Sequence, residues 1–274
     1  MTGASVHPPL QITTTGPVSE ADIDEVTSEI EPLLARVDRL SGAHLRLTHV
    51  TYPAAEQPAV AEVIIDVAGH VVRARAAAAN MAAAARLLQT TLADKLRRAS
   101  RALGTGHPVP PVTGGEQPHH VVARLGSGRG AEAHVVRHRP VRLARETARE
   151  AVLDMELGDY EFFLFVDALT GADCLLERRG PDTFQLFSAG AASCSEPGPG
   201  VSVLPADLRP PRIELAEAAR RLTDSEAEHL FFVDAATGRG SVLYRRYPGH
   251  YALISPAAGV GGAGRGEHGV LGSQ

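Results

Sequence analysis

The sequence predicts an α+β protein in which an N-terminal β-α-β-β-β-α domain precedes two small β-rich domains in tandem. Residues 10–104 combine short strand patterns with two helical patterns, which indicates one α/β unit. A stretch rich in glycine and proline then interrupts all periodicity. Beyond that stretch the chain repeats itself with a constant offset of 67 residues, which is typical of duplicated domains.

The elements of the N-terminal domain follow from capping signals and apolar spacing. A short alternating strand is expected over residues 10–14. Ser19 with Asp22 resembles a capping box, and apolar residues at spacings of three and four continue the helix to about Leu40. Pro32 lies inside this pattern and is expected to kink or divide the helix. Three strands and a second helix complete the domain, over residues 44–50, 59–67, 71–77 and 80–103.

The C-terminal half contains two copies of one module. The segment FVDALTG at residues 165–171 recurs as FVDAATG at residues 232–238. Each copy has the order helix, strand, hairpin turn, return strand and final strand. A unit of this size is marginally stable alone, so we expect pairing between copies to bury its remaining apolar surface. The predicted segments are a flexible linker at 105–131, copies at 132–190 and 200–256, and a disordered tail at 257–274.

Composition narrows the class of protein. The chain has 274 residues with 44% hydrophobic residues but only 4% aromatic ones, which suits small aliphatic cores. No run of eighteen apolar residues offers a membrane span, and the first residues lack the pattern of a secretory signal. Cys174 and Cys194 do not form a disulfide framework, which fits a reducing compartment. We therefore expect a cytoplasmic protein without a membrane partner.

Basic residues gather in one segment of the N-terminal domain, residues 86–101, which carries five bases and one acid although the net charge of the chain is −5. On the second helix, Arg86, Arg97 and Arg101 lie within about 60° of each other, opposite the apolar stripe, and Arg98 adjoins them. Strand alternation places Arg73 with Arg75 on one face of the sheet. Such a surface is either a solvated face or a site that contacts the phosphates of structured RNA.

No pattern of catalytic or cofactor-binding residues is recognisable. The glycines at residues 126–130 have no preceding strand and no Lys-Ser or Lys-Thr, so they indicate linker rather than a phosphate loop. The histidines near the linker lack the cysteine or carboxylate spacing of a metal site. We expect no cofactor, no bound metal and no small-molecule substrate, and a protein that is not an enzyme.

Four motifs in the first C-terminal copy resemble those of a known family. They are EAVLDMEL at residues 150–157, YEFFLF at 160–165, DALTG at 167–171 and ERR at 177–179. Their order and spacing closely resemble the C-terminal domain of long ribosome hibernation promoting factors. The N-terminal element order, with Asp94-Lys95-Leu96 and Arg98 in its last helix, is similar to that family's dsRBD-like ribosome-binding domain. Two C-terminal copies are the arrangement of its dormancy-associated actinobacterial members.

The resemblance implies a factor that occupies the decoding channel of the small ribosomal subunit. There it would exclude mRNA and tRNA, inhibit translation and preserve inactive ribosomes under stress or dormancy. Contacts to 16S rRNA phosphates are expected from Arg46, Arg73, Arg75, Arg86, Lys95, Arg97, Arg98 and Arg101. Pairing of C-terminal domains, within one chain or between chains, is expected to involve Phe163, Phe165, Phe232 and Tyr244. Pairing within one chain would favour silencing single ribosomes.

Two other classes of function stay open on the sequence. One is a binder of structured RNA that acts away from ribosomes. The other is a protein–protein regulator, for instance of transcription, in which the tandem copies dock a partner and the arginines are only solvated.

Overall fold

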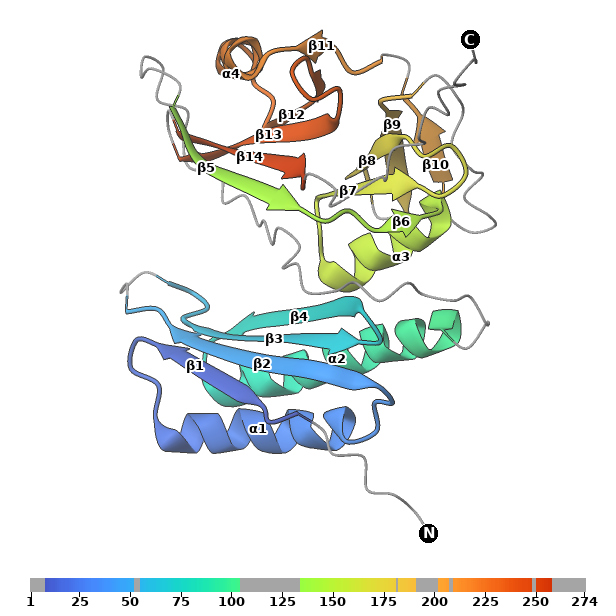
Figure 1. The fold of residues 1–274 in the computed structure, drawn as a ribbon. Helices are drawn as coiled ribbons and strands as arrows, with labels where there is room; N and C mark the ends of the chain where they lie inside the picture. Colours follow the sequence, from blue (N-terminus) through green and yellow to red (C-terminus); the bar gives the residue numbers. More distant parts are fainter. Residues whose placement is uncertain are drawn as a thin grey trace, which may run out of the picture.

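The computed structural model contains three β-sheets and four α-helices within the part of the chain that it describes (Figure 1). The described residues are 8–51, 55–103, 134–180, 182–190, 202–206, 209–247 and 250–257. A four-stranded sheet belongs to the N-terminal domain and two five-stranded sheets to the C-terminal half, which is the predicted α+β class. Within the described ranges, no helix has both the length and the apolar character needed to cross a membrane. The predicted linker at 105–131 lies outside these ranges, as does the predicted tail after residue 257.

The N-terminal domain has the predicted order of elements. Its elements are β1 (Gln11–Thr15), α1 (Glu20–Leu34), β2 (Leu40–His49), β3 (Ala59–Val67), β4 (His70–Ala78) and α2 (Met81–Leu103). The sheet order is β1-β2-β3-β4, with β1 parallel to β2 and the other pairs antiparallel. The β3–β4 hairpin turns at Ala68 and Gly69, whose φ angles of 55° and 93° suit a tight two-residue turn. β4 is therefore an edge strand of this sheet.

The start of α1 is capped as the sequence predicts. The Ser19 hydroxyl accepts a hydrogen bond from the Asp22 backbone N–H at 3.2 Å, and the Asp22 carboxylate accepts one from the Ser19 N–H at 2.9 Å. The Ser19 hydroxyl and N–H, as donors to the carboxylate, lower the pKa of Asp22 below its usual value. This reciprocal pair fixes the first turn of the helix.

The predicted end of α1 was wrong. The helix stops at Leu34 rather than near Leu40, because Pro32 in its last turn supplies no backbone N–H. The chain then reverses through Arg39, whose φ of 59° lies in the left-handed region, and enters β2. The apolar residues after Leu34 thus belong to a turn and a strand, although their spacing continues the helical pattern.

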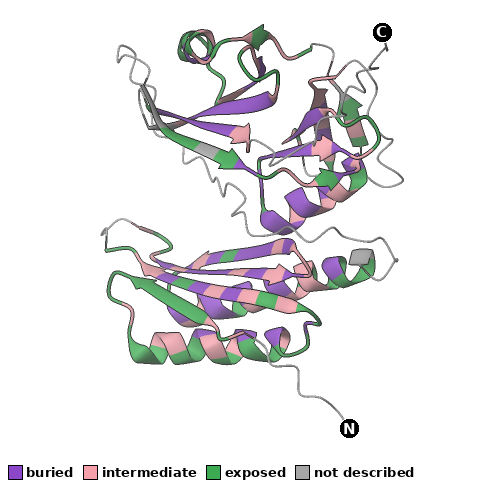
Figure 2. Cartoon of the chain, in the orientation of Figure 1, coloured by how far each residue is buried: buried purple, intermediate pink, exposed green. Residues whose placement is uncertain are grey.

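Both helices of this domain cover one face of the sheet (Figures 1 and 2). The strand residues that face the helices alternate along the chain, at odd positions in β2 and β3 and at even positions in β4. The predicted apolar stripe of α2 is buried against them, including Met81, Ala85, Leu88, Leu92 and Ala99. The opposite, open face of the sheet therefore carries the intervening residues of each strand.

The C-terminal half is built from two copies whose elements keep the offset of 67 residues. Copy 1 contains β6 (Arg145–Glu146), α3 (Ala148–Gly158), β7 (Phe162–Asp167), β8 (Asp173–Arg178) and β9 (Thr183–Ser188). Copy 2 contains β11 (Arg212–Ile213), α4 (Leu215–Asp224), β12 (His229–Asp234), β13 (Gly240–Tyr247) and β14 (His250–Pro256). The hairpin turns end at Gly171 and Gly238, whose φ angles of 70° and 69° explain the recurring glycine.

Two further strands cross from one copy to the other. β5 (His134–Val141) precedes copy 1 but lies parallel to β14 in the sheet of copy 2. β10 (Ser202–Pro205) precedes copy 2 but lies parallel to β9 in the sheet of copy 1 (Figure 1). The predicted starts at 132 and 200 assign each strand to the copy that follows it, whereas each strand completes the other copy's sheet. The two copies are thus joined by reciprocal strand exchange within one chain.

The sheets of the two copies enclose a shared apolar core. Its buried members are Val141, Phe162, Leu164, Leu175, Phe231, Val242, Tyr244, Ala252 and Ile254. Of the four residues predicted to pair the domains, only Tyr244 lies here. Phe163 and Phe165 pack in the core of copy 1 with α3, and Phe232 packs in the core of copy 2 with α4. The prediction was wrong for Phe163, Phe165 and Phe232 because side chains alternate along a strand, so each of them points to the opposite face from its neighbours in the shared core.

Candidate nucleic-acid interface

The outer face of α2 presents three exposed basic side chains from the set of predicted contact residues. Arg86, Arg97 and Arg101 are all exposed, as the helical spacing predicts. Arg97 forms an ion pair with Asp94 one turn earlier, but its side chain is still 63% exposed. Exposed guanidinium groups on one helix face can contact successive phosphates of a folded RNA.

The open face of the sheet holds a second, separate group of arginines. Arg46 and Arg75 are exposed there. Arg73 is buried instead, and its Nε donates to Glu62 Oε1 at 2.6 Å. Glu62 also pairs with Arg46, whose Nη1 lies 3.5 Å from Oε2. Glu62 thus neutralises much of this face, and the structure removes Arg73 from the accessible set.

Lys95 is also withdrawn from solvent, because it holds the end of α3 against the N-terminal domain. Its Nζ donates to the backbone carbonyls of Glu156 and Leu157, each at 3.2 Å, and to the carbonyl of Arg73 at 2.7 Å. It also pairs with the Asp159 carboxylate. A cation at a helix C-terminus satisfies carbonyls that have no partner in the helix and complements the helix dipole. Burial lowers the pKa of Lys95 from its usual value, and the Asp159 pair opposes this shift.

Arg98 lies at the edge of the same contact. Its Nη1 is 3.9 Å from Glu156 Oε2, and its side chain is 63% exposed. A surface pair of this length contributes little, so Arg98 is available to another partner. The eight predicted residues therefore divide between the outer face of α2, the open face of the sheet and the contact with α3.

The contact between the N-terminal domain and copy 1 contains a buried ionisable cluster that was not predicted from the sequence. His70 at the start of β4 pairs through Nδ1 with Asp154 of α3, and both side chains are nearly enclosed. Glu146 of β6 is buried beside Asp154. Leu157 of α3 packs into the N-terminal core next to this pair. A carboxylate on the otherwise apolar face of α3 is the sequence signal that marks this contact.

The cluster shifts the ionisation of both of its outer members. Burial disfavours the charged imidazole of His70, but the hydrogen bond to Asp154 and its charge, with smaller contributions from Asp66 and Glu150, outweigh burial and raise the pKa of His70. Burial, followed by the charge of Asp154 and a hydrogen bond to it, raises the pKa of Glu146 well above its usual value. The cluster therefore favours the neutral carboxyl form of Glu146 and the charged imidazolium form of His70.

Within the described ranges, no three histidine, cysteine or acidic side chains gather in a way that would hold a metal ion. Of the histidines near the linker, His107, His119 and His120 lie outside those ranges. His138 shares a hydrogen bond with the Ser255 hydroxyl at 2.8 Å. Cys174 is buried in the core of copy 1, and Cys194 lies outside the described residues.

Two solved structures share similarity with about a third of this chain. A ribosomal subunit interface protein from Coxiella burnetii is 16% identical, and the match covers 34% of this chain and 97% of that chain with a TM-score of 0.28. The N-terminal domain of Thermus thermophilus Protein Y is 22% identical, and the match covers 32% and 98% with a TM-score of 0.26.

Sequence comparison extends over nearly the whole chain. Residues 130–186 match the family model described as "Sigma 54 modulation/S30EA ribosomal protein C terminus". A protein named "Dormancy associated translation inhibitor" in two strains of Mycobacterium tuberculosis is 31% identical over 260 residues, which are 92% of this chain and 90% of that protein. The chain therefore belongs to the S30EA family of long ribosome hibernation promoting factors, with the dormancy associated translation inhibitors.

Proposed function

We propose that this protein binds the small ribosomal subunit, inhibits translation and preserves inactive ribosomes during dormancy. The observation that carries the proposal is the similarity to the dormancy associated translation inhibitor, which runs through 92% of the chain and so includes both halves of the fold. The action is non-enzymatic: the N-terminal domain fills the decoding channel and excludes mRNA and tRNA by occupancy.

The outer face of α2 is the surface proposed to contact 16S rRNA. Arg86, Arg97 and Arg101 are exposed there, and no other element covers them in the described chain. Neutralising phosphates with these side chains releases counterions, so binding weakens as salt rises. The shape of the folded RNA, rather than base readout, would select the site, because β2, β3 and β4 contain no phenylalanine, tyrosine or tryptophan for stacking.

The contact of α3 with β4 bears on which face binds first. Arg73 and Lys95 are engaged in the protein itself, whereas Arg86, Arg97 and Arg101 stay exposed while α3 is in place. Binding through α2 therefore needs no separation of the halves. An rRNA contact by Lys95 would require α3 to leave β4, and one by Arg73 would require Arg73 to break its pair with Glu62.

We also propose that the protein silences single ribosomes rather than joining two. The reciprocal exchange of β5 and β10 supports this, since each copy already finds its partner in the same chain. The apolar face that a second chain would need lies in the core between the copies.

A charge-reversal experiment tests the proposed rRNA face. Replacing Arg97 and Arg101 by Glu should weaken association with purified ribosomes and lower the slope of log affinity against log salt by about two. The matched control replaces Arg220 and Arg221 of α4 by Glu, which reverses two exposed arginines on a helix of the other half.

Equal loss in both variants would show that only net charge matters and would contradict a binding face on α2. Unchanged binding in the Arg97 and Arg101 variant would also exclude this face. Binding of isolated RNA hairpins as tight as that of ribosomes would favour a general binder of structured RNA.

A further inference from the structure

The reciprocal pairing of β5 and β10 relates the two copies by an approximate two-fold axis, and equivalent residues of the copies meet at their interface. In a symmetric pair, a residue on the axis faces its own equivalent. Phe162 and His229 are separated by the offset of 67 residues, and their rings lie 4.8 Å apart. Asp173 and Gly240 have the same offset and are also in direct contact. These two pairs therefore show which residues of the two copies face each other at the centre of the interface.

At Asp173 and Gly240 the two copies differ in charge and complement each other. The buried Asp173 carboxylate accepts a hydrogen bond from the Gly240 backbone N–H at 2.8 Å. It also accepts two from Arg239, from Nε and Nη2, each at 2.8 Å. A two-point bond between a guanidinium and a carboxylate is the strongest ion pair available to these side chains. The residue of copy 1 equivalent to Arg239 is Ala172, so copy 1 offers no such donor.

Space at this point allows a side chain on one copy only. A Cβ added at Gly240 would lie 2.8 Å from the Asp173 Cβ and 2.9 Å from the Phe231 ring. Such distances are shorter than carbon atoms tolerate. Two copies that both carried Asp here would bring Cβ atoms and unpaired buried carboxylates together, which is strongly unfavourable.

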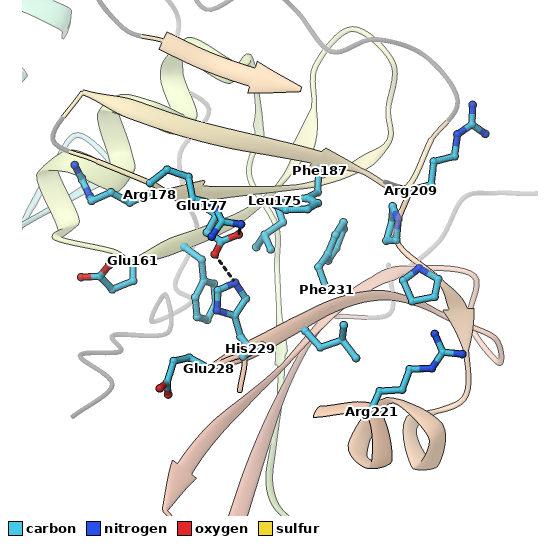
Figure 3. Close-up of a pocket in the computed structure, with 16 residues that line it drawn as sticks. Glu161, Leu175, Glu177, Arg178, Phe187, Arg209, Arg221, Glu228, His229 and Phe231 are labelled. Carbon is cyan, nitrogen blue, oxygen red and sulfur yellow. Dashed lines mark ion pairs between the residues drawn. The ribbon is translucent and has the colours of Figure 1, made fainter. Parts of the chain in front are cut away.

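A second asymmetric pair in the same interface also involves His229. Glu177 of copy 1 and His229 of copy 2 point toward each other across a hollow between the sheets, with 3.5 Å between Oε1 and Nε2 (Figure 3). Their equivalents are Tyr244 in copy 2 and Phe162 in copy 1, neither of which is charged. Two copies 1 facing each other would leave Glu177 opposite a phenyl ring.

We infer that the pairing face of copy 1 is specific for copy 2 and rejects another copy 1. The face of copy 2 that copy 1 accepts carries Gly240 at the axis and Arg239 immediately before it. Two chains of this protein can then join only by exchange, copy 1 of each with copy 2 of the other, and never through copy 1 alone. The inference concerns pairing only and does not depend on ribosome binding.

The first test gives copy 2 the three residues that copy 1 has at these positions, in the full chain. The changes are Phe231→Leu, Arg239→Ala and Gly240→Asp. Two opposed acids should lower the melting temperature by roughly 6–20 °C, since an unpaired buried charge is strongly destabilising. Amides of β8 and β13 should exchange with solvent at least about tenfold faster. A melting temperature and amide protection equal to those of the wild type would overturn the inference.

The second variant separates lost pairing from simple misfolding. It adds the reciprocal changes Leu164→Phe, Ala172→Arg and Asp173→Gly, so the acid and the arginine are exchanged between copies. We expect this six-residue exchange to restore most of the lost melting temperature and the amide protection. If it stays as unstable as the three-residue variant, pairing is not determined by these residues and the inference is wrong.

Discussion

Removing the amine of Lys95 should release the end of α3 from the N-terminal domain. Three backbone carbonyls, of Arg73, Glu156 and Leu157, accept hydrogen bonds from Nζ, and only 13% of the Lys95 side chain is exposed. Lys95→Met keeps an unbranched apolar stem but supplies no donor. We expect the contact with α3 to weaken while the core of the N-terminal domain stays intact.

The size of the effect follows from the groups left without a donor. Each buried carbonyl that loses its partner costs about 1 kcal/mol, so three cost about 3 kcal/mol. The variant no longer buries an ammonium group, and burial of that group is the effect that lowers the pKa of Lys95. Its removal offsets about 1 kcal/mol of this cost. A net loss of about 2 kcal/mol corresponds to a roughly 30-fold change in the opening equilibrium.

Amide hydrogen exchange at the end of α3 measures this opening. The N–H groups of Asp159 and Tyr160 both donate to the Met155 carbonyl in the cap that Lys95 holds. Their exchange should accelerate by about 30-fold in Lys95→Met. Arg97→Met is the matched control, because Arg97 lies on the same helix but is exposed and pairs only locally with Asp94. Exchange within threefold of the wild type in Lys95→Met would refute the role of Lys95 as a clamp.

Three other predictions concern stability. The wild type should be more stable than His70→Asn at low pH. This advantage should vanish as pH rises through the raised pKa of His70, because deprotonation removes the charged pair with Asp154. Melting curves at several pH values measure the difference in stability, and a difference that does not change with pH would contradict the prediction. Leu164→Ala should cost about 2–5 kcal/mol in urea unfolding because it empties the core between the copies, whereas Leu169→Ala, at a site 73% exposed, should change stability by less than about 0.5 kcal/mol. Ser19→Ala should cost about 1 kcal/mol through loss of the α1 cap, and an unchanged urea midpoint would contradict that role.

Local patterns predicted most of the fold. The 67-residue repeat predicted the two copies, and capping and spacing predicted the starts of α1 and α2. Local patterns could not predict which strand each strand pairs with. The exchange of β5 and β10 depends on contacts between segments far apart in the sequence, and neither strand shows a distinctive alternation. The end of α1 was missed because apolar spacing continued past Pro32.

The candidate site was predicted in part, for a related reason. Helical spacing identified the exposed arginines of α2, because an outer face depends only on the helix itself. The burial of Arg73 and Lys95 depends on Glu62 from a neighbouring strand and on α3 from another domain. Similarly, Phe163 and Phe165 were expected to pair the domains, although the alternate residues Phe162 and Leu164 face the other copy. Choosing between two apolar faces of one strand requires knowing what covers each.

Sedimentation of purified ribosomes with added protein tests the central proposal most directly. In a sucrose gradient at low salt, the protein should migrate with whole ribosomes or small subunits, and less of it should do so at moderate salt. Because the copies pair within one chain, the ribosome peak should stay at the position of single particles. Protein that remains at the top of the gradient at both salt concentrations would contradict ribosome binding. A heavier peak of paired ribosomes would contradict the silencing of single ribosomes.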